Sequence, residues 1–141
     1  MSMFPPEDVD ARVLHPAGWA PPRGYSDGLV TSGRYVVLAG QVGWNPQTAA
    51  FETDDFAAQV RQALANIGAL LIEAGAAPRH LVRLTWFVTD RAAYLQHRRE
   101  IGRAYREILG MHYPPMSVVV VSALVEERAK VEIEATAVIP E

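Results

Sequence analysis

The sequence predicts a single α+β domain in which two helices cover one face of a sheet of about five strands. The first observation is the order of the periodic segments along the chain, which reads β-β-α-β-α-β-β. The second is the length of 141 residues, half of them hydrophobic, which suits one domain with one core. The third is a valine-rich strand whose second face the two helices cannot cover, so we expect the chain to associate with further copies of itself.

The N-terminal third supplies an arm and two strands. Residues 1–23 contain FPPEDVD, HPAGW and APPRG, which predict an ordered or semi-ordered arm rather than regular structure. Two β-prone runs then flank Ser32 and Gly33, a turn signal that predicts a hairpin between them. Asn45 and Pro46 predict a turn after the second run.

Two segments have helical periodicity. The first, residues 54–76, has one apolar stripe, with Thr53 or Asp54 as its N-cap and Gly75 as its terminator. The second, residues 91–109, follows Asp90 as its N-cap and ends at Gly110. Its stripe consists of Tyr94, the stem of Arg98, Ile101, Tyr105 and Ile108.

Three further segments predict strands. In residues 80–90, alternation places four apolar side chains on one face: Val82, Leu84, Trp86 and Val88. Residues 116–124, MSVVVVSAL, are apolar on both faces, which predicts a central strand covered on both sides. In residues 129–139, an apolar face alternates with a polar one. The apolar face has Val131, Ile133, Ala135, Ala137 and Ile139, and the polar face has Lys130, Glu132, Glu134 and Thr136.

Composition excludes several classes of protein. The formal net charge of −3 gives no basic excess for nucleic acid, and we interpret the arginines of residues 96–106 as a solvated helix face. The absence of cysteine excludes disulfides and thiolate chemistry. The sequence has no signal peptide and no apolar run near ~20 residues, so we expect a soluble, cytoplasmic protein with no membrane partner. Four histidines lack the spacing of metal ligands: His15, His80, His97 and His112.

A few polar and aromatic residues are candidates for chemistry. Glu132 and Glu134 share one strand face, where a partly buried carboxylate can transfer protons or position water. The alternative is that both are solvated residues of an edge strand. Tyr25 can donate its hydroxyl to a ligand or anchor the N-terminal arm, and Trp44 can line a pocket or cover the first helix.

The sequence resembles the RidA family, also called the YjgF family, in five segments. In chain order they are GYSDGLVTSGRYVVLAGQVGWNPQT, QVRQALANIGALLIEAGA, LVRLTWFVTD, AYREIL and KVEIEATAV, from about Gly24 to Val138. The resemblance implies one RidA-like domain over residues 1–141, with a chorismate-mutase-like fold and a mixed sheet of five or six strands. It also implies a homotrimer with its sheets inside, its helices outside and ligand clefts between subunits. RidA-type members hydrolyse reactive 2-imino acids and enamines to 2-keto acids and ammonia without a cofactor.

The family's site residues carry over onto several positions of this chain. Tyr25 matches the tyrosine that lines the cleft, and Glu132 matches the glutamate that holds the attacking water. Gly40 matches the glycine whose backbone faces the ligand, and Gln41 continues that motif. We therefore expect Glu132 and Tyr25 to be catalytic and Gly40 and Gln41 to bind ligand, with Trp44 as an aromatic wall.

Three positions depart from the family pattern. Ala39 replaces a serine, Gly102 replaces an asparagine, and Met116 replaces the arginine that grips the substrate carboxylate. Methionine has no donor, so a carboxylate beside it would lose its charge-assisted bonds, at a cost of several kcal/mol. Met116 is instead suited to packing against a flat or irregular apolar ligand. Three arginines are candidates to replace the lost cation: Arg23, Arg34 and Arg83.

Two classes of function remain open at this point. The first is an imine or enamine deaminase whose activity on 2-imino acids is altered or lost. The second is a non-enzymatic trimer that binds a metabolite or acts as a regulator or chaperone. RNA cleavage, which has been described for some family members together with inhibition of translation, is disfavoured by the acidic charge balance.

Overall fold

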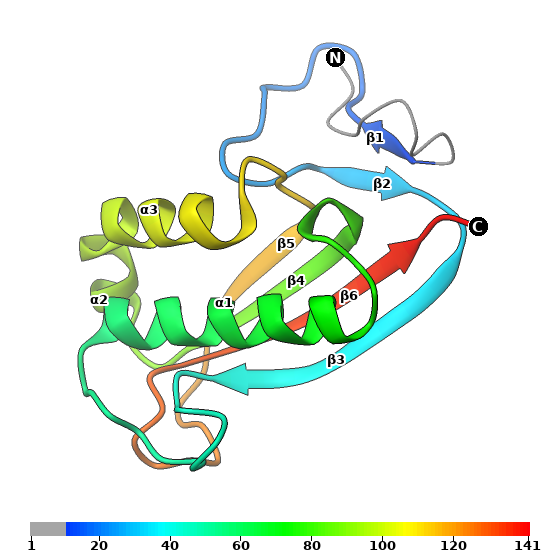
Figure 1. Cartoon of the computed structure of the whole chain (residues 1–141). Helices are drawn as coiled ribbons and strands as arrows, with labels where there is room; N and C mark the ends of the chain where they lie inside the picture. The colour runs from blue at the N-terminus through cyan, green and yellow to red at the C-terminus, as the bar shows by residue number, and fades with distance from the viewer. Residues whose placement is uncertain (1–10) are drawn as a thin grey trace.

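The computed structural model describes residues 11–141 and has an α+β fold, as the sequence predicts (Figure 1). Four strands form the main sheet: β3 (Arg34–Val42), β6 (Val131–Ile139), β4 (Leu81–Val88) and β5 (Met116–Val120), in that order across the sheet. β4 and β5 are parallel, whereas the other two pairs are antiparallel. The predicted mixed sheet is therefore confirmed, although its strands are grouped differently from the prediction.

The helices lie against one face of this sheet (Figure 1). They are α1 (Phe56–Glu73), α2 (Arg91–Gln96) and α3 (Arg98–Leu109), and a short 3-10 turn, η1 (Pro78–His80), leads into β4. α1 begins at Asp55, whose carboxylate accepts from the backbone N–H of Ala58 at 2.9 Å, and not at the predicted caps Thr53 or Asp54. The chain leaves α1 through Gly75, as predicted, since its φ of +75° favours glycine.

The core fills the space between the helices and the sheet. α1 contributes Val60, Leu64, Ile67 and Leu71, all fully buried. The predicted apolar face of β6 is buried at Val131, Ile133, Ala135 and Ala137. β4 buries Leu84, Trp86 and Val88 as predicted, but Leu81 replaces Val82, because the pairing with β6 shifts register between Leu81 and Arg83.

The predicted second helix is two helices. At His97, between α2 and α3, the backbone leaves helical geometry, with φ −105° and ψ +13°. The imidazole Nδ1 lies 2.6 Å from the carbonyl oxygen of Ala93, and the ring packs beside Phe56 with centroids 5.8 Å apart. The ring thus contacts the backbone at the point where the helix breaks, while the N–H of His97 still donates to the carbonyl oxygen of Ala93 at 3.1 Å. Asp90 caps α2 as expected, accepting from the N–H of Ala93 at 3.2 Å.

The predicted hairpin around Ser32 and Gly33 does not form. β2 (Gly28–Val30) pairs with β1 (Arg12–Leu14), and β3 pairs with β6. The turn signal itself is real, because Gly33 has φ +144° and a Cβ there would collide with the carbonyl oxygen of Ile139. The strands on either side of the turn diverge into two sheets. β1 also places regular structure inside the predicted arm, whose residues 1–10 lie outside the described range.

The valine strand is at the edge of the sheet, which corrects its predicted central position. β5 has β4 on one side and no strand of residues 11–141 on the other. Val118, Val119 and Val120 are 38%, 40% and 54% exposed. A sequence that is apolar on both faces indicates that a strand is covered, but it does not tell whether its own chain or another molecule covers it.

Within residues 11–141, much of the sheet face opposite the helices is uncovered. On β3, Tyr35 is 72% exposed and Val37 is 75% exposed. The polar face of β6, with Glu132 and Glu134, lies on the same side of the sheet. Within residues 11–141 no helix is long and apolar enough to span a membrane.

Candidate functional site

Glu132 and Gly40 lie against each other on neighbouring strands. The pairing of β3 with β6 is irregular between Leu38 and Gln41, which leaves Gly40 within the irregularity. A Cβ built on Gly40 would lie 2.6 Å from Oε2 of Glu132, so only the bare glycine backbone fits there. Irregularities of this kind often lie beside active sites, because they re-aim a side chain or open the backbone to a ligand.

Glu132 has the setting of a carboxylate that is free to act. Its strand, β6, lies between β3 and β4 and is therefore not an edge strand, although Glu134 on the same face is exposed. Its side chain is half-buried, and its neighbour across the strand pair is Phe87. Within residues 11–141 the carboxylate of Glu132 makes no hydrogen bond or ion pair, so its oxygens remain available to a water or a ligand.

Gln41 and Ala39 complete this first group. The side-chain amide of Gln41 donates to the carbonyl oxygen of Ala39 at 3.1 Å, which folds the glutamine back over the irregular segment. The group therefore contains four of the predicted site residues: Ala39, Gly40, Gln41 and Glu132.

A second group forms around Met116 at the other edge of the sheet. A cavity of about 160 Å³ is lined by Met116 at the start of β5, Gly102 on α3 and Gly24 before β2, with walls from Trp86 and Tyr113. The structure thus brings Met116 and Gly102, two of the positions that depart from the family pattern, into the lining of one cavity.

Tyr25 is held near this second group by its neighbour Ser26. Ser26 donates its N–H to the carbonyl oxygen of Pro114 at 3.3 Å and its hydroxyl to that of Tyr113 at 2.8 Å. These bonds fasten the segment to the proline turn that precedes Met116. Tyr25 itself is 41% exposed, so its hydroxyl is accessible from outside the chain.

Trp44 belongs to neither group. It follows β3, its ring centroid is 5.8 Å from that of Phe51, and its carbonyl oxygen accepts from the buried side chain of Asn66 at 3.2 Å. The cavity beside Met116 does not include it. Trp44 therefore packs in the loop between β3 and α1. This position is closer to the predicted alternative, in which Trp44 covers the first helix, than to a place in the wall of a pocket.

The two groups are far apart in the sheet of one chain. β4 separates β6, which carries Glu132, from β5, which begins at Met116. The groups also use different faces: Glu132 is paired with Phe87 on the uncovered face, and Met116 is paired with Leu84 on the helix face. One copy of the chain therefore does not assemble the whole predicted site.

The sequence reading missed Arg98. None of the three arginines considered as replacements lines the Met116 cavity; Arg83, for example, donates to the hydroxyl of Ser117 at 3.5 Å on the uncovered face. Arg98 does line it. The available signal was spacing, because Arg98 and Gly102 are four residues apart and so share a helix face.

A larger cavity, of about 610 Å³, contains none of the predicted site residues. It lies along residues 122–130, with Asp54 and Thr89 on its other side. Two of its charged groups are paired with each other, since the guanidinium of Arg128 bonds Asp54 at 3.0 Å and also donates to the carbonyl oxygen of Phe51 at 2.9 Å. We therefore consider the smaller cavity beside Met116 the more informative one.

Known proteins resemble this chain over most of its length. The family model described as endoribonuclease L-PSP matches residues 17–139. A RutC family protein of Haemophilus influenzae is 34% identical over 109 residues, which cover 77% of this chain and 82% of that protein. The 2-iminobutanoate/2-iminopropanoate deaminase of Salmonella typhimurium is 34% identical over 112 residues, covering 77% of this chain and 83% of that enzyme.

Solved structures give the same result. The Rid family protein YyfB of Yersinia pestis superposes with a TM-score of 0.81 at 33% identity, covering 92% of this chain and 99% of that one. Escherichia coli TdcF with bound serine superposes with a TM-score of 0.64 at 33% identity, covering 86% of this chain and 91% of that one. The chain therefore belongs to the RidA (YjgF) family, whose family model is described as endoribonuclease L-PSP.

Proposed function

We propose that this chain is a cytoplasmic imine deaminase that acts as a homotrimer, with a preference shifted away from small 2-imino acids. The observation that carries the proposal is the contact between Gly40 and the unpaired carboxylate of Glu132. Relatives named 2-iminobutanoate/2-iminopropanoate deaminase support the reaction class.

The separation of the two groups of site residues supports a site between subunits. If the uncovered sheet face of one copy packs against the β5 edge of the next, the Glu132 group of the first copy can meet the Met116 and Tyr25 group at that edge. Tyr35 and Val37, exposed on that face, supply apolar surface for the contact. A ligand would then lie between the two groups.

The reaction needs only side chains of the protein and one water. Glu132 accepts a proton from the water, whose oxygen forms a bond to the imine carbon. As the C=N double bond opens, Glu132 passes this proton to the nitrogen, which gives a carbinolamine. The hydroxyl proton of the carbinolamine then also moves to the nitrogen, the C–N bond breaks as the C=O bond forms, and the products are ammonia and a carbonyl compound. In this scheme Tyr25 donates its hydroxyl to the substrate, and no cofactor takes part.

Met116 is the reason for proposing a shifted preference. A thioether gives a substrate carboxylate no hydrogen bond, whereas an arginine would give two parallel ones. We expect weak or absent turnover of 2-iminopropanoate compared with the deaminase of Escherichia coli, which is a relative of this chain.

A coupled assay tests the proposal. An amino-acid oxidase generates each imine in place, and the loss of the imine is followed with wild-type protein and with Glu132→Gln. Turnover of at least one imine that disappears in the glutamine variant is the expected result. Turnover of 2-iminopropanoate at the rate of the E. coli enzyme would contradict the shifted preference. Binding without turnover of any imine would favour a non-enzymatic, ligand-binding trimer.

A further inference from the structure

The cavity beside Met116 has the size and lining of a pocket for one ring. Its walls are the side chains of Trp86, Tyr94, Ile101, Tyr105, Tyr113 and Met116, and its volume is about 160 Å³. An apolar cavity of about 150 Å³ in a protein is large enough to hold benzene. Tyr105 and Tyr113 stack with centroids 5.2 Å apart and offer an aromatic surface on one side.

Gly102 keeps this pocket open. It is the lining residue of α3 that has no side chain, and a Cβ added there would meet only Arg106, whose Nη1 would lie 3.1 Å away. That contact is with the flexible end of a side chain, so the backbone does not require glycine at this position. A longer side chain at residue 102 would occupy space that the pocket now offers.

Arg98 is the charged residue among those that line this pocket. Its side chain is exposed, so it lies at the opening. Within residues 11–141 no carboxylate is paired with it. Burial raises the pKa of Tyr94, while the neighbouring charge of Arg98 lowers it; burial also raises the pKa of Tyr105. Both tyrosines are therefore neutral at physiological pH, and the positive charge of Arg98 is not compensated by them.

Trp86 adds a donor without a partner. Its side chain is 3% exposed, and its indole N–H makes no hydrogen bond within the described part of the chain. A buried donor without an acceptor is destabilising, so a ligand oxygen that reached this N–H would be favoured.

We infer that this pocket binds the ring of a small aromatic carboxylate and that Arg98 holds the carboxylate at the opening. In relatives, an arginine is expected at the position of Met116. Here Arg98 on α3 supplies that positive charge instead, and the space that the arginine side chain would fill accepts the ring of the ligand. The inference rests on the proposed function in one respect: it names aromatic 2-imino acids as the substrate class of that site.

Binding measurements on the full chain test this directly. The probes are benzoate and phenylpyruvate, with benzamide as the uncharged analogue and pyruvate as the analogue without a ring. Calorimetry and tryptophan fluorescence measure the binding of each probe. We expect the two aromatic acids to bind roughly tenfold or more tightly than benzamide or pyruvate, as one charge-assisted hydrogen bond and one buried ring predict.

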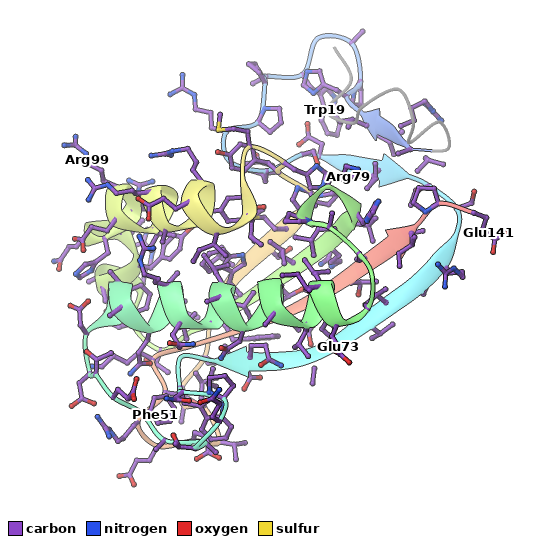
Figure 2. All side chains as sticks on the ribbon, in the orientation of Figure 1. Trp19, Phe51, Glu73, Arg79, Arg99 and Glu141 are labelled. Atoms are coloured by element: carbon purple, nitrogen blue, oxygen red, sulfur yellow. The ribbon has the colours of Figure 1, made fainter. Side chains whose placement is uncertain are left out.

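Three variants separate the contributions. Arg98→Gln should weaken benzoate binding roughly tenfold and leave benzamide binding unchanged. Arg99→Gln is the matched control, because Arg99 extends from α3 into solvent, away from the sheet (Figure 2), and should leave both unchanged. Gly102→Leu should weaken both ligands by filling the pocket. Its melting temperature should not fall, since leucine favours helix more than glycine does.

The outcomes distinguish this inference from the proposed function. Equal affinity for benzoate and pyruvate, or unchanged benzoate binding in Arg98→Gln, would overturn the inference. If benzoate binds as expected but no imine is hydrolysed, the proposed reaction fails and the pocket stands. If 2-iminopropanoate is hydrolysed and no aromatic acid binds, the reaction stands and the pocket assignment fails.

Discussion

The backbone of Gly40 and the carboxylate of Glu132 occupy adjoining space, such that a Cβ on Gly40 would lie 2.6 Å from Oε2 of Glu132. The contact depends on the irregular pairing between β3 and β6, which neither residue's own sequence neighbourhood reveals. It couples the position of a candidate catalytic carboxylate to the absence of a side chain on the next strand.

Gly40→Ala should therefore move Glu132 without unfolding the protein. The atoms that the new methyl group meets belong to the Glu132 side chain, which can rotate away. We expect imine turnover to fall at least tenfold, since a misplaced catalytic group is costly, with little change in melting temperature. Kinetics and thermal melting measure the two effects.

Gly68→Ala is the matched control for this change. Gly68 lies in α1, where a Cβ would make an ordinary contact of 3.7 Å with Ile108. This variant should keep full turnover and gain up to about 1 kcal/mol of stability from helix propensity. If both alanine variants turned over imines equally well, the contact with Glu132 would have no functional role.

Met116→Arg should increase activity on small 2-imino acids. The guanidinium would supply the two charge-assisted bonds that methionine cannot make, and one such bond alone is worth roughly a factor of ten in binding. The measurement is kcat/KM for 2-iminopropanoate in the coupled assay. Met111→Arg is the control, since Met111 is 71% exposed and outside the cavity. An unchanged kcat/KM in a folded Met116→Arg variant would argue against a substrate carboxylate at this position.

Val37→Lys should weaken self-association. Val37 is 75% exposed on the uncovered sheet face, and a charge buried in an apolar interface without a partner is strongly unfavourable. Light scattering after size-exclusion chromatography gives the molar mass, which we expect to fall from three chains to one. Ile72→Lys is the control, because Ile72 is 78% exposed on α1, on the helix side of the sheet. A trimer that survived Val37→Lys would place the interface elsewhere.

Local signals in the sequence correctly predicted features that depend on one segment of the chain alone. Alternation on β6 and the stop at Gly75 depend on the residues themselves and were predicted correctly. The hairpin at Gly33 was wrong, because a turn signal states that the chain bends and not which strand it pairs with. The break at His97 coincides with a side-chain contact to the carbonyl oxygen of Ala93, which periodicity does not report.

The resemblance named candidate site residues but did not give their arrangement in space. The segments around Gly40 and Glu132 identify neighbouring strands only once the register of β3 and β6 is known. Periodicity places the stem of Arg98, unlike Arg99, on the apolar stripe of its helix, but only the structure shows the cavity beside it. Charge and spacing in a sequence do not state what a helix face is packed beside.

Gln59→Leu should lower the free energy of unfolding by roughly 3 kcal/mol, because it leaves three part-buried backbone groups without their partner. Gln59 is fully buried on α1; its amide donates to the carbonyl oxygens of Thr53 and Arg128, and its side-chain oxygen accepts from the N–H of Lys130 at 2.8 Å. Urea unfolding measures the change. Gln62→Leu, which loses a single side-chain bond to Asn66, should cost much less, and equal losses would contradict this account.

Stability should fall at alkaline pH because of Tyr105. Burial, and secondarily the neighbouring Tyr113, raises the pKa of Tyr105 above its ordinary value of 10.0, and its hydroxyl donates to the carbonyl oxygen of His112 at 2.7 Å. The folded state therefore holds this proton more tightly than the unfolded state. The stabilisation is fully present below pH 10 and is lost as the pH rises above it, by up to about 1.4 kcal/mol per pH unit. Burial of Tyr94 acts in the same direction.

Tyr105→Phe separates this proton from other alkaline effects. At pH 8 the variant should be less stable than wild type by about 1 kcal/mol, through loss of the bond to His112. Above pH 10 its free energy of unfolding should fall less steeply, so the two curves converge. Urea unfolding between pH 8 and pH 11 provides both curves, and Tyr35→Phe, at a 72% exposed position, should follow wild type. Parallel curves for wild type and Tyr105→Phe would mean that the Tyr105 proton is not what limits alkaline stability.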